Sequence, residues 1–106
     1  MQLNFTNKNF ELTPSIKHHI NSKFSYLEKH YHHLYKVHVI LRKERNTQIA
    51  EANIHVNHKD INAIAKNRDL YAAVDILVSK LNSQLAKYKN KRQYKRHDQA
   101  SINDTK

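Results

Sequence analysis

The C-terminal third of this chain carries a run of basic residues with no acid to balance it. Between residues 76 and 97 the sequence has seven Lys or Arg residues and no Asp or Glu. Residues three or four positions apart lie on one face of a helix. Four polar residues therefore share one flank of a helix in this region: Lys80, Gln84, Lys87 and Lys91. Cations held at such intervals suit the phosphates of a nucleic acid.

A second set with helical spacing lies near the N-terminus and consists of His19, Lys23, Tyr26 and His30. If this flank faces the first one, the two form a basic groove in which Tyr or His can stack on bases. The alternative is a solvated helix face. Such faces normally mix charges, because opposite charges at i,i+4 stabilise a helix. The helix dipole favours cations only in the last turn, which does not account for Lys80.

Few residues in the sequence support a metal site or catalysis. The chain has nine His residues, three of them within residues 30–33, but it has no Cys and few acids near them. We therefore expect neither a metal nor a cofactor. Glu44 and Glu51 are predicted to lie across a hairpin beside Lys43 and Arg45, as cross-strand charge pairs do. Because no nucleophile motif is present, we expect no enzyme.

Composition narrows the class of protein further. The 106 residues fit one domain, and a net charge of +10 favours an anionic partner. The N-terminus lacks the pattern of a signal peptide, and no apolar run approaches the length that spans a bilayer. We expect a soluble cytoplasmic protein with no membrane partner. Since the chain has no Gly, Gly-rich phosphate loops are excluded, and we expect Asn46 to serve a turn.

The elements that position these residues follow from hydrophobic spacing. Residues 2–6 alternate as a strand does, and Thr13 followed by Pro14 is typical of a helix start. The apolar stripe of that helix is Ile16, Ile20, Phe24, Leu27 and Tyr31. Alternation over residues 37–42, 50–56 and 61–65 predicts three further strands in an antiparallel meander.

The second helix is predicted to begin after an Asp69 N-cap. Its apolar stripe is Leu70, Val74, Leu77, Leu81, Leu85 and Tyr88. The order β-α-β-β-β-α indicates an α+β, two-layer domain, with two helices on one face of a four-stranded sheet. We expect one core that includes Ile20, Phe24, Val39, Ile54, Val74 and Leu81. The domain is predicted to span residues 1–92, and residues 93–106 form a polar, disordered tail.

Residues 1 to about 91 resemble the ribosome hibernation-promoting factor family, which includes the ribosome-associated inhibitor called protein Y. The matching stretches are MQLNFT, LTPSI, SKFSYLEKH, VHVILRKE, IAEANIHVN and DLYAAVDILVSKLNSQLAKYK. The last of these is the most specific, and the colinear match over the domain carries the resemblance. It implies the same β-α-β-β-β-α fold, similar to double-stranded-RNA-binding domains.

The resemblance also implies a function. Family members bind the small ribosomal subunit, its 16S ribosomal RNA and proteins, in the channel that mRNA and tRNA use, and translation stops. The RNA-binding residues implied here are Lys23, Lys80, Lys87, Lys89 and Lys91, and Arg92 continues the run. Ser83 stands where family members are often basic. We expect a stress-response protein that is a monomer away from the ribosome.

Two questions stay open at this point. Short members of the family cooperate with a ribosome modulation factor to pair ribosomes into inactive dimers, whereas inhibitor-type members oppose pairing. The tail of this chain is intermediate in length, so its effect on dimers is undecided. The alternative function is a general double-stranded-RNA-binding module, which grips the minor groove by shape and shows no preference for ribosomes.

Overall fold

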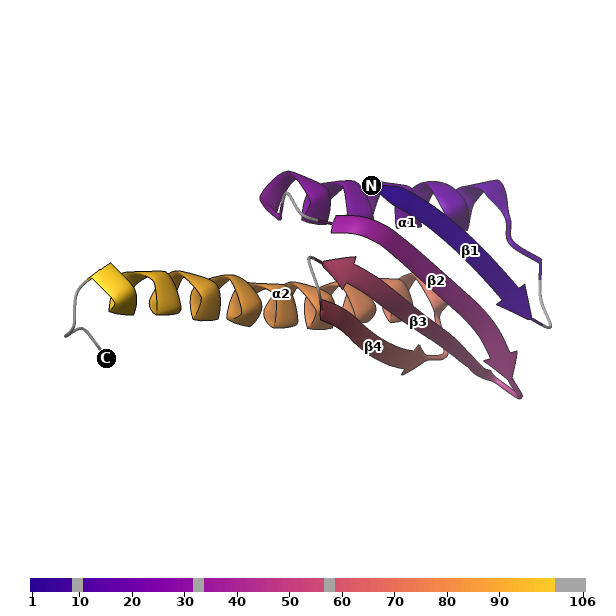
Figure 1. Cartoon of the computed structure of the whole chain (residues 1–106). Helices are drawn as coiled ribbons and strands as arrows, with labels where there is room; N and C mark the ends of the chain where they lie inside the picture. Colours follow the sequence, from indigo (N-terminus) through magenta and orange to yellow (C-terminus); the bar gives the residue numbers. More distant parts are fainter. Residues whose placement is uncertain (9–10, 32–33, 57–58, 101–106) are drawn as a thin grey trace.

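The computed structural model describes residues 1–8, 11–31, 34–56 and 59–100, with side chains up to Tyr88. The elements are β1 (Gln2–Lys8), α1 (Pro14–His30), β2 (Leu34–Glu44), β3 (Thr47–Val56), β4 (Lys59–Asn67) and α2 (Leu70–Ala100). Both helices lie on the same face of the sheet (Figure 1). The predicted α+β fold with β-α-β-β-β-α order is therefore confirmed.

The sheet is mixed. Its strand order is β1-β2-β3-β4, with β1 parallel to β2 and the other two pairs antiparallel. The parallel pair follows from the connection, because α1 carries the chain back across the sheet before β2 begins. The predicted meander corresponds to β2, β3 and β4, and the two edge strands are β1 and β4.

The core lies between the sheet and the helices, as the spacing predicts. The six expected core residues, Ile20, Phe24, Val39, Ile54, Val74 and Leu81, are all fully buried. Four alanines of the sheet, Ala50, Ala52, Ala63 and Ala65, are buried beneath the helices and allow close packing.

The helix starts also agree with the sequence. Thr13 Oγ1 accepts a hydrogen bond from Ile16 N over 3.3 Å, and Pro14 is the first helical residue. At the start of α2, Asp69 Oδ1 accepts from Tyr71 N over 3.1 Å. Both caps satisfy amides that the first turn of a helix leaves without a carbonyl partner.

The turn between β2 and β3 differs from the expectation. Arg45, with φ 58°, takes the left-handed conformation, rather than the neighbouring Asn46. Two-residue hairpin loops need positive φ at the first position in the common primed turns. The pairing of Glu44 with Thr47 makes Arg45 that first position, so register decides over residue preference.

Helix α2 continues beyond the predicted domain boundary. It extends through Ala100 and projects past the end of the sheet (Figure 1), so residues 93–100, which we expected in a disordered tail, are helical. No Gly or Pro interrupts this stretch, and its Gln, Lys, Arg and Ala residues favour a helix without a partner surface. Residues 101–106 lie outside the described part. Within that part, no helix combines the length and the apolar character needed to cross a membrane.

Candidate RNA-binding surface

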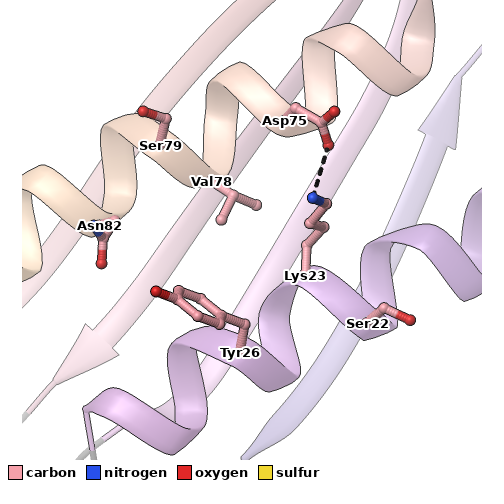
Figure 2. A pocket seen from close by; sticks show the side chains of 7 residues that line it. All are labelled: Ser22, Lys23, Tyr26, Asp75, Val78, Ser79 and Asn82. Carbon is pink, nitrogen blue, oxygen red and sulfur yellow. Dashed lines mark ion pairs between the residues drawn. The ribbon is translucent and has the colours of Figure 1, made fainter.

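The flank of α2 that faces α1 carries a single carboxylate, which contacts a histidine and a lysine of α1. Asp75 Oδ1 accepts a hydrogen bond from His19 Nε2 over 2.8 Å, and Lys23 Nζ lies 3.6 Å from the same oxygen (Figure 2). The His19 ring also meets Tyr71 edge-on, with centroids 4.9 Å apart. We call this side of α2, with Tyr71, Asp75 and Asn82, the α1 flank.

A hollow of about 460 Å³ lies between the two helices, and we call it the interhelix hollow. Figure 2 shows Asp75 and Lys23 at one end, and Tyr26 and Asn82 at the other, with Val78 between them. Its remaining lining residues are Ser22 and Ser79. The ring of Tyr26 is half exposed, and His30 packs against it with the centroids 4.3 Å apart.

A tyrosine joins the helices beside this hollow. Tyr31, the C-cap residue of α1, donates its hydroxyl to Asn82 Oδ1 over 3.1 Å. Together with the Asp75 contacts, this bond ties α1 to α2 at two separate points. The α1 flank is therefore occupied by contacts between the helices rather than by free cations.

The opposite flank of α2 contacts the edge of the sheet. Lys80 Nζ donates to the carbonyl oxygen of Ile64 over 2.7 Å, and Gln84 Nε2 donates to that of Asn62 over 2.9 Å. Both carbonyls belong to β4, an edge strand. We call this side of α2, with Lys80, Gln84 and Lys87, the β4 flank. Covering an edge strand in this way protects it against pairing with another chain.

These contacts overturn one expectation. The predicted basic groove places Lys80 opposite Lys23, but the two residues lie on different sides of α2. At 3.6 residues per turn, Asp75 and Lys80 are about 140° apart around the helix. The apolar stripe on the sheet separates the two flanks, so only one of them can face α1. The flank of α1 with His19, Lys23 and Tyr26 meets Asp75 instead.

The six residues implied for RNA binding thus fall into three groups. Lys23 borders the interhelix hollow, and Lys80 and the exposed Lys87 belong to the β4 flank. The side chains of Lys89, Lys91 and Arg92 lie outside the described part, although their backbone belongs to α2. Their roles in RNA binding stay predictions. The sequence pattern did not identify Asp75 as a site residue. The signal that could have found it is the presence of an acid five residues before Lys80, where the basic run begins.

The open face of the sheet, opposite the helices, carries an arginine between two acids. Arg42 lies 3.6 Å from both Glu44 and Glu51. The predicted partners of these acids, Lys43 and Arg45, are thus replaced by Arg42, because alternation along β2 puts Arg42 on the same face as Glu51.

Two further histidines of the described part, His38 and His55, form local pairs. His55 Nδ1 is 2.8 Å from Asp60 Oδ1 across β3 and β4, and His38 shares a 2.7 Å hydrogen bond with Thr6. Within the described ranges, no three His, Asp or Glu side chains come together as a metal site would require. Two members of the predicted His cluster, His32 and His33, lie outside those ranges.

The fold and the surface together define a class: a small α+β domain with two helices on one face of a mixed sheet and a strongly basic second helix. Residues 3–93 match the family described as "Sigma 54 modulation protein / S30EA ribosomal protein", and the chain belongs to that family.

Named relatives agree with this assignment. The chain is 46% identical over 91 residues to the ribosome hibernation promoting factor of Klebsiella oxytoca, covering 86% of this chain and 96% of that protein. It is 41% identical to the factor of the same name from Escherichia coli K12, with the same coverage.

Solved structures share the fold. A ribosomal subunit interface protein from Coxiella burnetii superimposes with a TM-score of 0.81 at 28% identity, covering 85% of this chain and 99% of that one. The N-terminal domain of Thermus thermophilus Protein Y gives a TM-score of 0.77 at 22% identity, covering 83% and 99%. The second likeness concerns the fold alone.

Proposed function

We propose that this protein is a ribosome hibernation factor that binds the small ribosomal subunit through the basic surface of its helices and stops translation. The observation that carries the proposal is the run of seven basic residues without an acid along α2, which projects past the sheet. Family membership and relatives named as hibernation promoting factors support it. The partner is ribosomal RNA in the channel for mRNA and tRNA, and the protein acts in the cytoplasm as a binding protein, not an enzyme.

The contacts on the two flanks of α2 determine how much each lysine can contribute to RNA binding. Lys80 already donates to a backbone carbonyl, and Lys23 lies beside a carboxylate, so neither is a free cation. Lys87 is exposed and begins the dense part of the run. We therefore assign the main phosphate contacts to Lys87 and to the continuation of the run at Lys89, Lys91 and Arg92.

Sedimentation of the purified full chain with small subunits tests this proposal. Phosphate contacts release counterions, so affinity falls steeply as salt rises. With the four contacts assigned above, we expect a roughly hundredfold loss of affinity between 50 and 200 mM salt. In a translation assay, the protein should inhibit synthesis at concentrations that saturate the subunits.

The alternatives give different outcomes in the same experiment. Binding that barely responds to salt would indicate protein–protein recognition. Equal affinity for a purified RNA duplex would identify a general double-stranded-RNA-binding module. Gradients of whole ribosomes, with and without a ribosome modulation factor, would then show whether this chain promotes or opposes dimers.

A further inference from the structure

The interhelix hollow contains an acid on a chain that otherwise accumulates positive charge. Asp75 is the one carboxylate among the residues that line it. A surface that only held phosphates would gain nothing from a carboxylate, because like charges repel. An acid at this place is suited to a neutral group that donates hydrogen bonds.

The carboxylate of Asp75 is held in one orientation. His19 Nε2 and Lys23 Nζ both approach Oδ1, and the ammonium group of Lys23 offsets part of its charge. About half of the Asp75 side chain remains exposed. A carboxylate has acceptor positions on both oxygens, so Oδ2 and the outer side of Oδ1 can accept further hydrogen bonds from the hollow.

The rest of the hollow suits a flat heterocycle. Val78 lies between the two polar ends, and the half-exposed ring of Tyr26 stands on α1 beside it (Figure 2). Aromatic side chains provide stacking surfaces for unpaired bases. The volume of about 460 Å³ falls in the range of pockets that take small ligands.

We propose that the interhelix hollow takes an unpaired guanine of ribosomal RNA, with Asp75 accepting hydrogen bonds from its N1–H and N2 amino groups. The inference rests on the proposed function and names the base that this site reads. Guanine is the base whose Watson–Crick edge presents two adjacent donors, which match the two oxygens of a carboxylate. Adenine and cytosine offer an amino group next to an acceptor, and that acceptor would face the carboxylate unfavourably. Lys23 is placed to contact a phosphate near the bound base.

Chemical probing of small subunits with kethoxal tests this inference, because kethoxal reacts with N1 and N2 of unpaired guanines. The full-length protein is bound at saturation, and occupancy is measured by sedimentation before probing. We expect the kethoxal reactivity of at least one guanine to fall about tenfold. With Asp75→Ala at equal occupancy, that guanine should return to within about twofold of its reactivity in the free subunit.

Two further variants keep the test decisive. Ser79→Phe fills the hollow from an exposed position and keeps the Asp75 carboxylate in the chain, and it should restore the same reactivity even if Asp75→Ala does not fold. Lys66→Gln, at an exposed lysine of the open sheet face, should leave the guanine protected on subunits that carry the protein. Protection of no guanine, or equal protection by the wild type and Asp75→Ala, overturns the inference while small-subunit binding stands. Failure of the wild type to sediment with subunits instead rejects the proposed function, and the inference with it.

Discussion

The two flanks of α2 have opposite relationships to their neighbours. On the α1 flank, Asp75 and Asn82 accept hydrogen bonds from His19 and Tyr31 of the other helix region. On the β4 flank, Lys80 and Gln84 donate to backbone carbonyls of an edge strand. One helix therefore offers acceptors on one side and donors on the other.

This difference follows from what each flank has to satisfy. An edge strand exposes unpaired carbonyl groups, and Lys and Gln side chains can donate to them. Helix α1 and its C-cap residue Tyr31 present donors, so the residues of α2 that pair with them have to be acceptors. Charge along α2 thus has a structural part at Lys80, which contacts the sheet, and an exposed part that begins at Lys87. Net charge alone does not separate the two parts.

The largest effect is expected for the apolar stripe of α2, which lies between the two flanks and holds the helix on the sheet. Leu81 is fully buried beside Lys80 in the chain. We expect Leu81→Ala to lower the free energy of unfolding by about 2–5 kcal/mol, because apolar burial is reduced and a cavity remains. Urea denaturation followed by circular dichroism measures it. A change below about 0.5 kcal/mol would mean that the stripe does not anchor α2.

The next effect concerns the basic run that begins at Lys87. We expect Lys87→Gln with Lys91→Gln to weaken small-subunit binding about tenfold and to lower the salt slope by about 1 for each phosphate that is no longer neutralised. The matched control is Lys36→Gln with Lys66→Gln, two exposed lysines on the open sheet face, for which we expect less than a threefold change. Arg42 is a poor control because two carboxylates hold it.

Equal effects of the two double variants would show that bulk charge, rather than its place on α2, determines affinity. A larger effect of the sheet-face pair would place the RNA on the other side of the molecule. In either case, the inhibition measured in translation assays at matched protein concentrations should follow the affinity for small subunits.

Most of the fold could be predicted from the sequence because it depends on local signals. Thr13–Pro14 marks a helix start, and apolar residues spaced by three and four mark the buried stripes. The pairing of flanks could not be predicted in the same way. Helical spacing shows that Lys80 and Gln84 share a side, but not which neighbour that side meets. That choice depends on where α2 lies relative to α1 and β4, which is a property of the tertiary packing.

The candidate site likewise has one residue that local sequence signals identify and one that only tertiary packing reveals. Charge and spacing point to Lys87, whereas they do not point to Asp75, because a single acid at the start of a basic run carries no pattern. The role of Asp75 becomes visible only when α1 brings His19 and Lys23 to it. The turn at Arg45 is a parallel case, since strand register set the conformation against the residue preference.

A smaller effect is expected at the second tie on the α1 flank. Tyr31→Phe removes the hydroxyl that donates to Asn82 Oδ1 and leaves the ring in place. We expect the free energy of unfolding to fall by about 0.5–1.5 kcal/mol, the usual range for one hydrogen bond. Tyr26→Phe, which removes the hydroxyl of a half-exposed tyrosine of α1, is the reference. Thermal unfolding of both variants at one salt concentration compares them, and an equal shift would contradict a specific tie between the helices.

The smallest effect is expected at Lys80. The family resemblance implies that Lys80 binds RNA, whereas its contact with β4 implies a structural role. If Lys80 were a main phosphate contact, Lys80→Met would weaken small-subunit binding as much as Lys87→Met does. Because its ammonium group donates to Ile64 O, we instead expect affinity to fall by less than about twofold, against a several-fold fall for Lys87→Met. Removing the bond to Ile64 should cost at most about 1 kcal/mol of stability, since the group is exposed and water can replace it. Affinity measured at two salt concentrations separates the roles, because a structural Lys80 leaves the salt slope unchanged. A slope lowered by about 1 in Lys80→Met would show that RNA draws this lysine away from β4.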